Sequence, residues 1–187
     1  MIRWLILCTA CIALAGPADA AGARLKGLSA LSKELSARIA PHDGPIELDR
    51  YMPADGLDDL VGTWAAFGTE HTFQNGMPNA VNMVLFRLAF SGFAQSLAKS
   101  CASPQLLLNE QFYATLETLC SWPSPEAKSE KVLTSFWLAI VGYGAPQQEY
   151  GIWRDFVLAT YGEKKAQEAI ESMTLAVMLN PFFLLDQ

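Results

Sequence analysis

The chain has 187 residues, of which 51% are hydrophobic, and it carries a formal net charge of -6. This composition excludes a disordered polypeptide, and the negative charge argues against nucleic acid as a partner, because the phosphates would be repelled. The length fits a single domain with one sizeable core behind a short N-terminal segment.

Residues 1–20 are predicted to be a secretory signal peptide. Arg3 precedes an apolar run that ends at Leu14 and is too short to cross a bilayer, and the small side chain of Ala20 suits a signal peptidase. An N-terminal membrane anchor is the alternative interpretation. We therefore expect residues 21–187 to form the mature protein, with no later stretch long enough for a membrane span, and to reside in the periplasm or outside the cell.

The mature chain is predicted to begin with one amphipathic helix and a long connection. Over residues 23–40, apolar residues recur at spacings of three and four, and Pro41 ends the pattern. Residues 41–56 hold three prolines and two glycines, which favours an irregular connection with scope for motion. Together, residues 21–56 form an N-terminal helix and linker, after which helical spacing resumes over residues 57–67.

The loop at residues 69–80 is the candidate binding site. It combines an aromatic side chain with more hydrogen-bonding groups than any other predicted loop, namely His71, Phe73, Gln74, Asn75 and Asn79. A polar loop presented by a rigid helical scaffold is a common binding arrangement. In the alternative interpretation, the Asn-Gly turn and a helix cap at Asn79 have only local structural roles.

His71 and the adjacent Glu70 are the weak catalytic candidates. Imidazole titrates near neutrality, so His71 could act as a general base in a small hydrolase or isomerase. The alternative is an ordinary loop histidine, since adjacent side chains often point apart. The sequence has no second ligand at metal-binding spacing and no motif for haem attachment, phosphate binding or a serine nucleophile. It therefore predicts no metal site and no cofactor.

Residues 79–100 are predicted to form a central helix around which the other helices pack. The segment is apolar nearly all the way round. Its one polar line recurs at every fourth residue, at Arg87, Ser91, Gln95 and Lys99. We expect this line to face solvent, and we prefer that interpretation to one in which Arg87 clamps a buried anion.

Cys101 and Cys120 are predicted to form a disulfide, because they are the only cysteines left after signal cleavage and the compartment is oxidising. A reactive thiol pair or a metal pair is the alternative. An antiparallel helical hairpin would hold the two cysteines about 17 Å apart, whereas a disulfide needs Cα atoms within about 7 Å. The linker at residues 102–108 must therefore double back.

Four more helices are predicted in the second half of the chain. They are a helix that Asn109 caps and that runs to Cys120, a helix from Ser124-Pro125 to Val141, a helix ending near Gly162, and residues 163–179. With six to seven helices and no convincing alternating strand, the sequence predicts an all-α, single-domain, irregular helical bundle. Its aromatic side chains are at core spacing, although they could instead line a ligand pocket or a protein interface.

The last third of the chain resembles a known kind of helical domain. The segments that carry the resemblance are EKVLTSFWLAIVGYGAP, QQEYGIWRDFV and AIESMTLAVMLNPFFLLDQ, between residues 129 and 187. They are similar to helical domains of unknown function that accompany cytochrome-c-type domains in large secreted proteins of planctomycete type. The resemblance implies a helical accessory module whose partner is a redox protein.

Our leading hypothesis is an exported, non-enzymatic helical module that binds another envelope protein. The alternatives are a small hydrolase or isomerase centred on His71, an accessory protein of a periplasmic redox system, and a bundle that holds haem through an inward-facing histidine.

Overall fold

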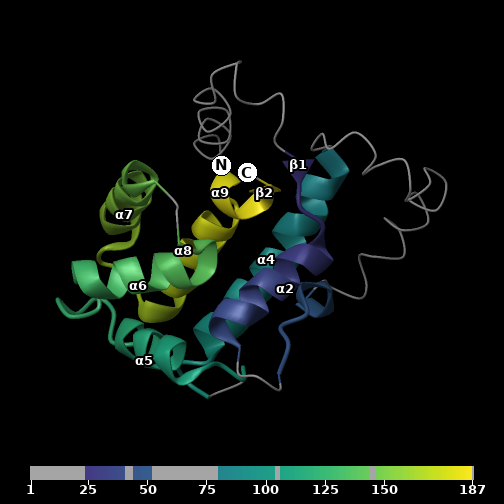
Figure 1. Cartoon of the computed structure of the whole chain (residues 1–187). Coiled ribbons are helices and arrows are strands. Elements are labelled where there is room, and N and C mark those ends of the chain that lie inside the picture. The colour runs from purple at the N-terminus through teal and green to yellow at the C-terminus, as the bar shows by residue number, and fades with distance from the viewer. Residues whose placement is uncertain (1–23, 41–43, 52–79, 104–105, 144–145, 187) are drawn as a thin grey trace.

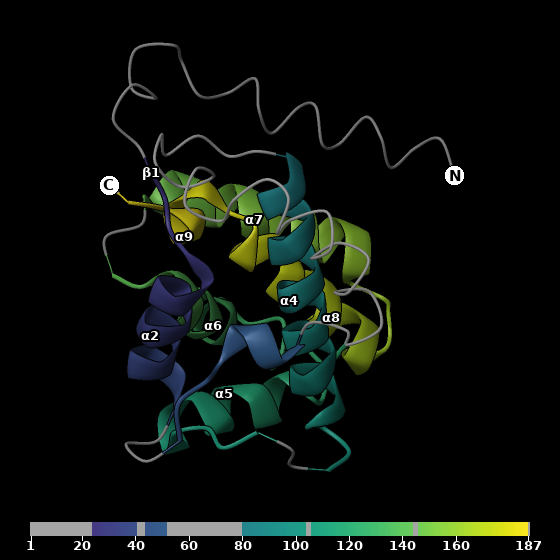
Figure 2. The same cartoon turned by 90° about the vertical axis from the view of Figure 1, so that its right-hand side faces the viewer.

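The computed structural model describes residues 24–40, 44–51, 80–103, 106–143 and 146–186. The predicted signal peptide and the predicted helix over residues 57–67 lie outside this part of the chain, so both remain predictions. The predicted all-α class is confirmed. Figures 1 and 2 show a bundle of helices that cross at varied angles rather than a parallel stack.

The described residues form seven α-helices, one 3-10 helix and one pair of two-residue strands. The α-helices are α2 (Leu28–Ile39), α4 (Ala80–Lys99), α5 (Glu110–Leu119), α6 (Glu130–Val141), α7 (Gln147–Tyr161), α8 (Ala166–Met178) and α9 (Pro181–Leu184). The 3-10 helix is η1 (Leu48–Tyr51). The strands β1 (Arg24–Leu25) and β2 (Leu185–Asp186) pair antiparallel and join the two ends of the described chain.

Helix α4 is the central helix, as predicted, and packs most extensively against α8 and then against η1 (Figure 2). Its buried side chains include Phe86, Phe90, Phe93 and Leu97. The predicted solvent line is also confirmed, since Arg87, Gln95 and Lys99 are exposed and Ser91 is half-buried.

Part of the connection after α2 is ordered by two serines of that helix. The backbone amide of Ile46 donates to the Ser36 hydroxyl at 2.7 Å, and the amide of Leu48 donates to the Ser32 hydroxyl at 3.0 Å. The side chains of Ile46 and Leu48 are both buried. Residues 44–51 are therefore fixed in place, in contrast to the wholly irregular linker that the prolines predicted.

Three predicted helix starts are wrong, and one of them is that of α8, which begins at Ala166 rather than at residue 163. Helix α2 begins at Leu28 rather than near residue 23, because Arg24 and Leu25 are extended and pair with β2. Helix α6 begins at Glu130 rather than at Pro125. The Ser124 hydroxyl does accept a hydrogen bond from the amide of Ala127 at 3.2 Å, but it caps only an isolated turn.

The predicted disulfide between Cys101 and Cys120 is present, with the Cα atoms 5.4 Å apart. The end of the linker agrees with this geometry, because Asn109 is fastened to α2. The backbone amide of Asn109 donates to the carbonyl of Ile39 at 2.9 Å, and the side-chain amide of Asn109 donates to the carbonyl of Arg38 at 2.7 Å. Helix α5 then returns toward α4, so the two cysteines meet at the C-terminal ends of their helices.

We expect the disulfide to stabilise the protein by about 3 kcal/mol, because it closes a loop in the unfolded chain. Urea denaturation with and without reductant should show this difference in the free energy of unfolding. Two free thiols in protein that was alkylated before any reduction would contradict the assignment.

Gly92 should be intolerant of a side chain, because a β-carbon there would overlap the backbone carbonyl of Tyr51 in η1. We expect Gly92→Ala to lower the free energy of unfolding by about 1–3 kcal/mol. Gly151→Ala is the matched control, since Gly151 lies inside α7 with nothing within 4 Å of an added β-carbon. That variant should gain up to about 1 kcal/mol from helix propensity. Equal stability of the two variants would contradict the packing of η1 on α4.

Candidate functional site

The binding loop favoured by the sequence lies outside the described residues. No position is therefore assigned to Glu70, His71, Phe73, Gln74, Asn75 or Asn79, and their roles remain predictions. Within the described ranges, no helix is long and apolar enough to cross a membrane. The same ranges hold no group of three or more His, Cys, Asp or Glu residues placed to bind a metal ion.

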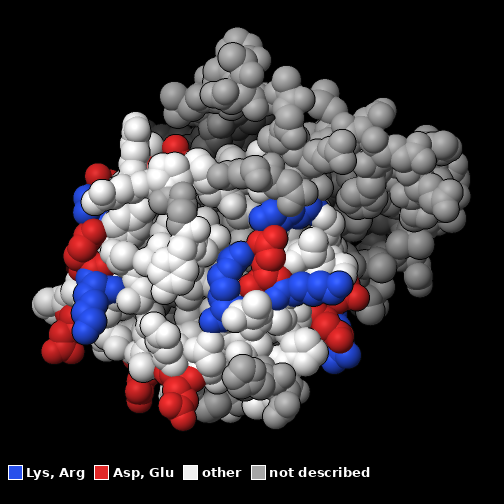
Figure 3. Space-filling model, viewed as in Figure 1, with Lys and Arg blue, Asp and Glu red and all other residues white. Residues whose placement is uncertain are grey.

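A hollow of about 390 Å³ lies where α2, the C-terminal end of α6 and the α9–β2 segment meet. We call it the α2/α6 hollow. Its lining consists of Lys26, Glu34, Arg38, Val141, Gly142, Tyr143, Phe182 and Leu185. Basic and acidic side chains lie together on this face of the molecule, over α2 (Figure 3).

Glu34 joins the two cations of the α2/α6 hollow through a single oxygen atom. Its Oε2 accepts from Lys26 Nζ at 3.0 Å and from Arg38 Nη2 at 2.8 Å. The backbone positions Lys26, whose amide donates to the carbonyl of Leu184 at 2.8 Å beside the β1–β2 pair. The side chains of Lys26 and Arg38 are 11% and 24% exposed, so both cations are largely withdrawn from water.

Arg38 also connects α2 to the C-terminal end of α6. Its Nη1 donates to the carbonyl of Ile140, one of the last carbonyls of α6, which lack partners within the helix. The negative end of the helix dipole favours a cation at this place. Next to the guanidinium, Gly142 has φ 95°, and a β-carbon there would come within 3.2 Å of Arg38 Cζ. The glycine therefore allows the backbone turn and also leaves room for the arginine.

Tyr143 stands at the rim of the hollow with 91% of its surface exposed. No other large hydrophobic or aromatic side chain among the described residues is exposed to this extent. The hollow thus combines two partly desolvated cations, one carboxylate and a solvent-facing aromatic ring. Such a set can bind a charged group and provide an apolar contact beside it, but it shows no nucleophile paired with a base.

Sequence reasoning missed this site because its parts come from distant segments of the chain. Lys26 and Arg38 lie near the N-terminus, whereas Gly142 and Leu185 lie in the last third. In the sequence, Gly142 and Tyr143 indicate only the end of the helix that runs to Val141. Nothing in the local pattern indicates that it lies against an arginine more than a hundred positions earlier.

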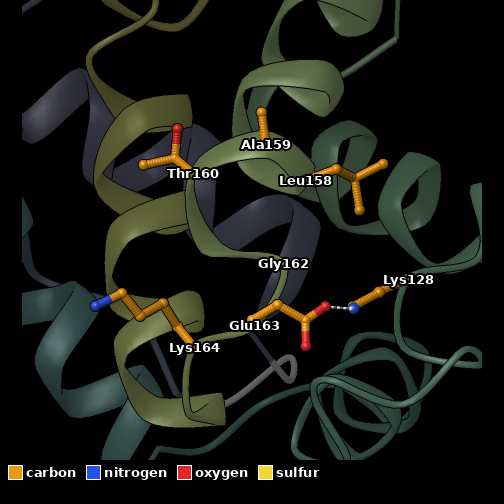
Figure 4. A pocket seen from close by; sticks show the side chains of 7 residues that line it. All are labelled: Lys128, Leu158, Ala159, Thr160, Gly162, Glu163 and Lys164. Carbon is orange, nitrogen blue, oxygen red and sulfur yellow. Dashed lines mark hydrogen bonds and ion pairs between the residues drawn. The ribbon is translucent and has the colours of Figure 1, made fainter.

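A second hollow of about 520 Å³ lies at the C-terminal end of α7 (Figure 4). Lys128 Nζ and Glu163 Oε1 are 3.1 Å apart there, while Lys164 points away from this pair. The Glu163 side chain is 93% exposed, so water screens the ion pair. Lys128 Nζ also lies 5.9 Å from the ring centroid of Trp122, so the lysine contacts the turn that contains this tryptophan. We assign this hollow a structural role.

The aromatic residues of α6 and α7 belong to the core rather than to a ligand pocket. Phe136, Trp137 and Trp153 are buried, and the Trp137 and Trp153 ring centroids are 5.3 Å apart. Tyr150 packs on the same cluster, and its burial raises the pKa of the phenol above the usual value. The core interpretation of their spacing is confirmed.

Comparisons of the chain with protein-family models, curated proteins and solved structures give no match. The geometry of the α2/α6 hollow is therefore the basis on which a function is proposed. The resemblance of the last third to accessory domains of redox proteins remains a prediction.

We expect Arg38→Met to lower the free energy of unfolding by roughly 1–3 kcal/mol, because the Ile140 carbonyl and Glu34 each lose a donor. Arg154→Met is the matched control. Arg154 Nη1 is also paired with a glutamate, Glu130, at 2.9 Å, but on the exposed surface, so its loss should leave stability nearly unchanged. Urea denaturation of both variants measures the difference. An equally stable Arg38→Met variant would show that this arginine does not hold α2 to α6.

Proposed function

We propose that the protein is an exported, non-enzymatic helical module that binds another envelope protein through the α2/α6 hollow. The observation that carries the proposal is the 91% exposed ring of Tyr143 beside two partly buried cations, Lys26 and Arg38. Tyrosine and arginine are enriched at the energetic centres of protein interfaces. A ring in solvent contributes little to folding, whereas a partner that covers it would bury a large apolar area.

The surroundings of Tyr143 support a preformed binding surface. Ile140 and Val141, just before it in α6, are buried, and Gly142 rests against the guanidinium of Arg38. A partner would therefore meet an Arg38 guanidinium that is already positioned. Preorganisation of this kind lowers the entropy cost of association.

The disulfide between Cys101 and Cys120 supports export. Disulfides form and persist in oxidising compartments such as the periplasm and the extracellular space. This agrees with the predicted signal peptide over residues 1–20, and it motivates the choice of an envelope protein as the partner. The enzyme centred on Glu70 and His71 stays a prediction.

Site-specific photocrosslinking in the producing cell tests the proposal. With a benzophenone amino acid in place of Tyr143, we expect irradiation to give one dominant adduct with an envelope protein. The control position is Tyr113, which is 42% exposed. It belongs to α5, a helix that lies at the opposite end of the molecule from α9 in Figure 1. The Tyr113 position should not give that adduct.

Failure of the Tyr143 position to crosslink, or an identical adduct pattern from both positions, would contradict binding through the α2/α6 hollow. Thermal unfolding of the two substituted proteins provides the folding control, because both exposed positions should tolerate the replacement.

A further inference from the structure

We infer that the α2/α6 hollow recognises a carboxylate that stands beside an apolar side chain in the ligand. The inference rests on the proposed function, because it names the chemical group that a partner would place in this hollow. Three sources offer this chemistry: the carboxyl terminus of a polypeptide, an aspartate or glutamate side chain, and a free organic acid.

The charges of the hollow leave room for one more anion. Among the described lining residues, Lys26 and Arg38 each carry one positive charge and Glu34 carries one negative charge, so this set has one net positive charge. This positive charge stands out in a chain whose formal net charge is -6. A singly charged carboxylate neutralises it.

The hydrogen-bond donors of the two cations are also incompletely used. Lys26 Nζ has one side-chain acceptor among the described residues, Glu34, although an ammonium group has three N–H donors. Arg38 Nη1 and Nη2 each have one acceptor, and a guanidinium has five N–H donors. A carboxylate between the two cations would form charge-assisted hydrogen bonds, which are the stronger kind in a partly desolvated site.

The lining of the hollow is mostly polar, with a smaller apolar part at its edge. Val141 is 8% exposed, and Phe182 and Leu185 are half-buried, with Tyr143 at the rim. A ligand with a hydrocarbon side chain next to its carboxylate would contact both parts at once. The hollow has a volume of about 390 Å³ and is open to solvent, so a short chain end or a single side chain in it would stay partly exposed.

Fluorescence anisotropy tests the inference by measuring the affinity of short labelled peptides for the protein. The protein is purified from cells that express the full-length sequence. The first peptide ends in leucine with a free carboxylate, and the second is identical but amidated. A third, also amidated, carries an internal aspartate between two leucines, and N-acetyl-leucine serves as a free-acid competitor. We expect at least one of the carboxylate probes to bind about tenfold or more tightly than the amidated peptide.

Lys26→Met should weaken binding of that carboxylate probe by about tenfold or more while keeping the apolar stem of the side chain. Lys128→Met is the matched control, because Lys128 is also paired with a glutamate, in the other hollow. It should bind as the unaltered protein does. Circular dichroism establishes that both variants are folded, and Lys26→Arg should restore binding if loss of charge is the cause.

The carboxylate probe that binds most tightly identifies the source of the carboxylate. Tight binding of any of the three carboxylate probes supports the inference. Equal affinity for the acid and the amidated peptides, or equal binding by Lys26→Met and the unaltered protein, would overturn it. If no carboxylate probe binds but Tyr143 still crosslinks to an envelope protein, the carboxylate inference fails and the binding module stands. If the probes bind but Tyr143 does not crosslink, the proposed protein partner fails instead.

Discussion

Burial of the aromatic side of α4 is the constraint on which the rest of the structure depends. Phe90 and Phe93 are fully buried, and burying each such ring contributes about 1.5–3 kcal/mol. To cover them, α8, η1 and α9 must all lie against the same helix. The resulting positions bring the C-terminal segment beside the start of α2, where the two strands pair.

The α2/α6 hollow follows from this arrangement, because it forms where the elements around the core end. Pairing of β1 with β2 places Lys26 near Glu34, and Arg38 reaches across to the last carbonyls of α6. A partly buried ion pair contributes little net stability, since dehydrating the charges offsets their attraction. The main structural role of Arg38 is therefore its bond to α6, whereas the unneutralised charge is the basis for the inferred carboxylate site.

Much of the fold could be predicted because periodicity and capping act over short distances. The solvent line through Arg87 follows from a four-residue repeat. The cap at Asn109 follows from its side-chain chemistry, and Phe112 donates to it at 2.9 Å as expected. The same local rules failed at Ser124, where a cap forms but the turn does not continue as a helix.

The site could not be predicted, because its contacts join residues far apart in the chain. A two-residue strand such as Arg24–Leu25 has no detectable alternation, so nothing in the sequence places Lys26 beside the C-terminal segment. The role of Gly142 depends on the guanidinium that lies against it. Only the three-dimensional arrangement shows that this helix end and that arginine form one surface.

The most direct test of the central claim is an NMR titration that follows the guanidinium Nε–H signals as N-acetyl-leucine is added. Arg154 provides the internal control, because its guanidinium is already bonded to Asp155 and Glu130 on the outer surface. A preformed carboxylate site in the α2/α6 hollow predicts a saturable shift of the Arg38 signal and little change at Arg154. Equal, non-saturating shifts at both arginines would contradict the account.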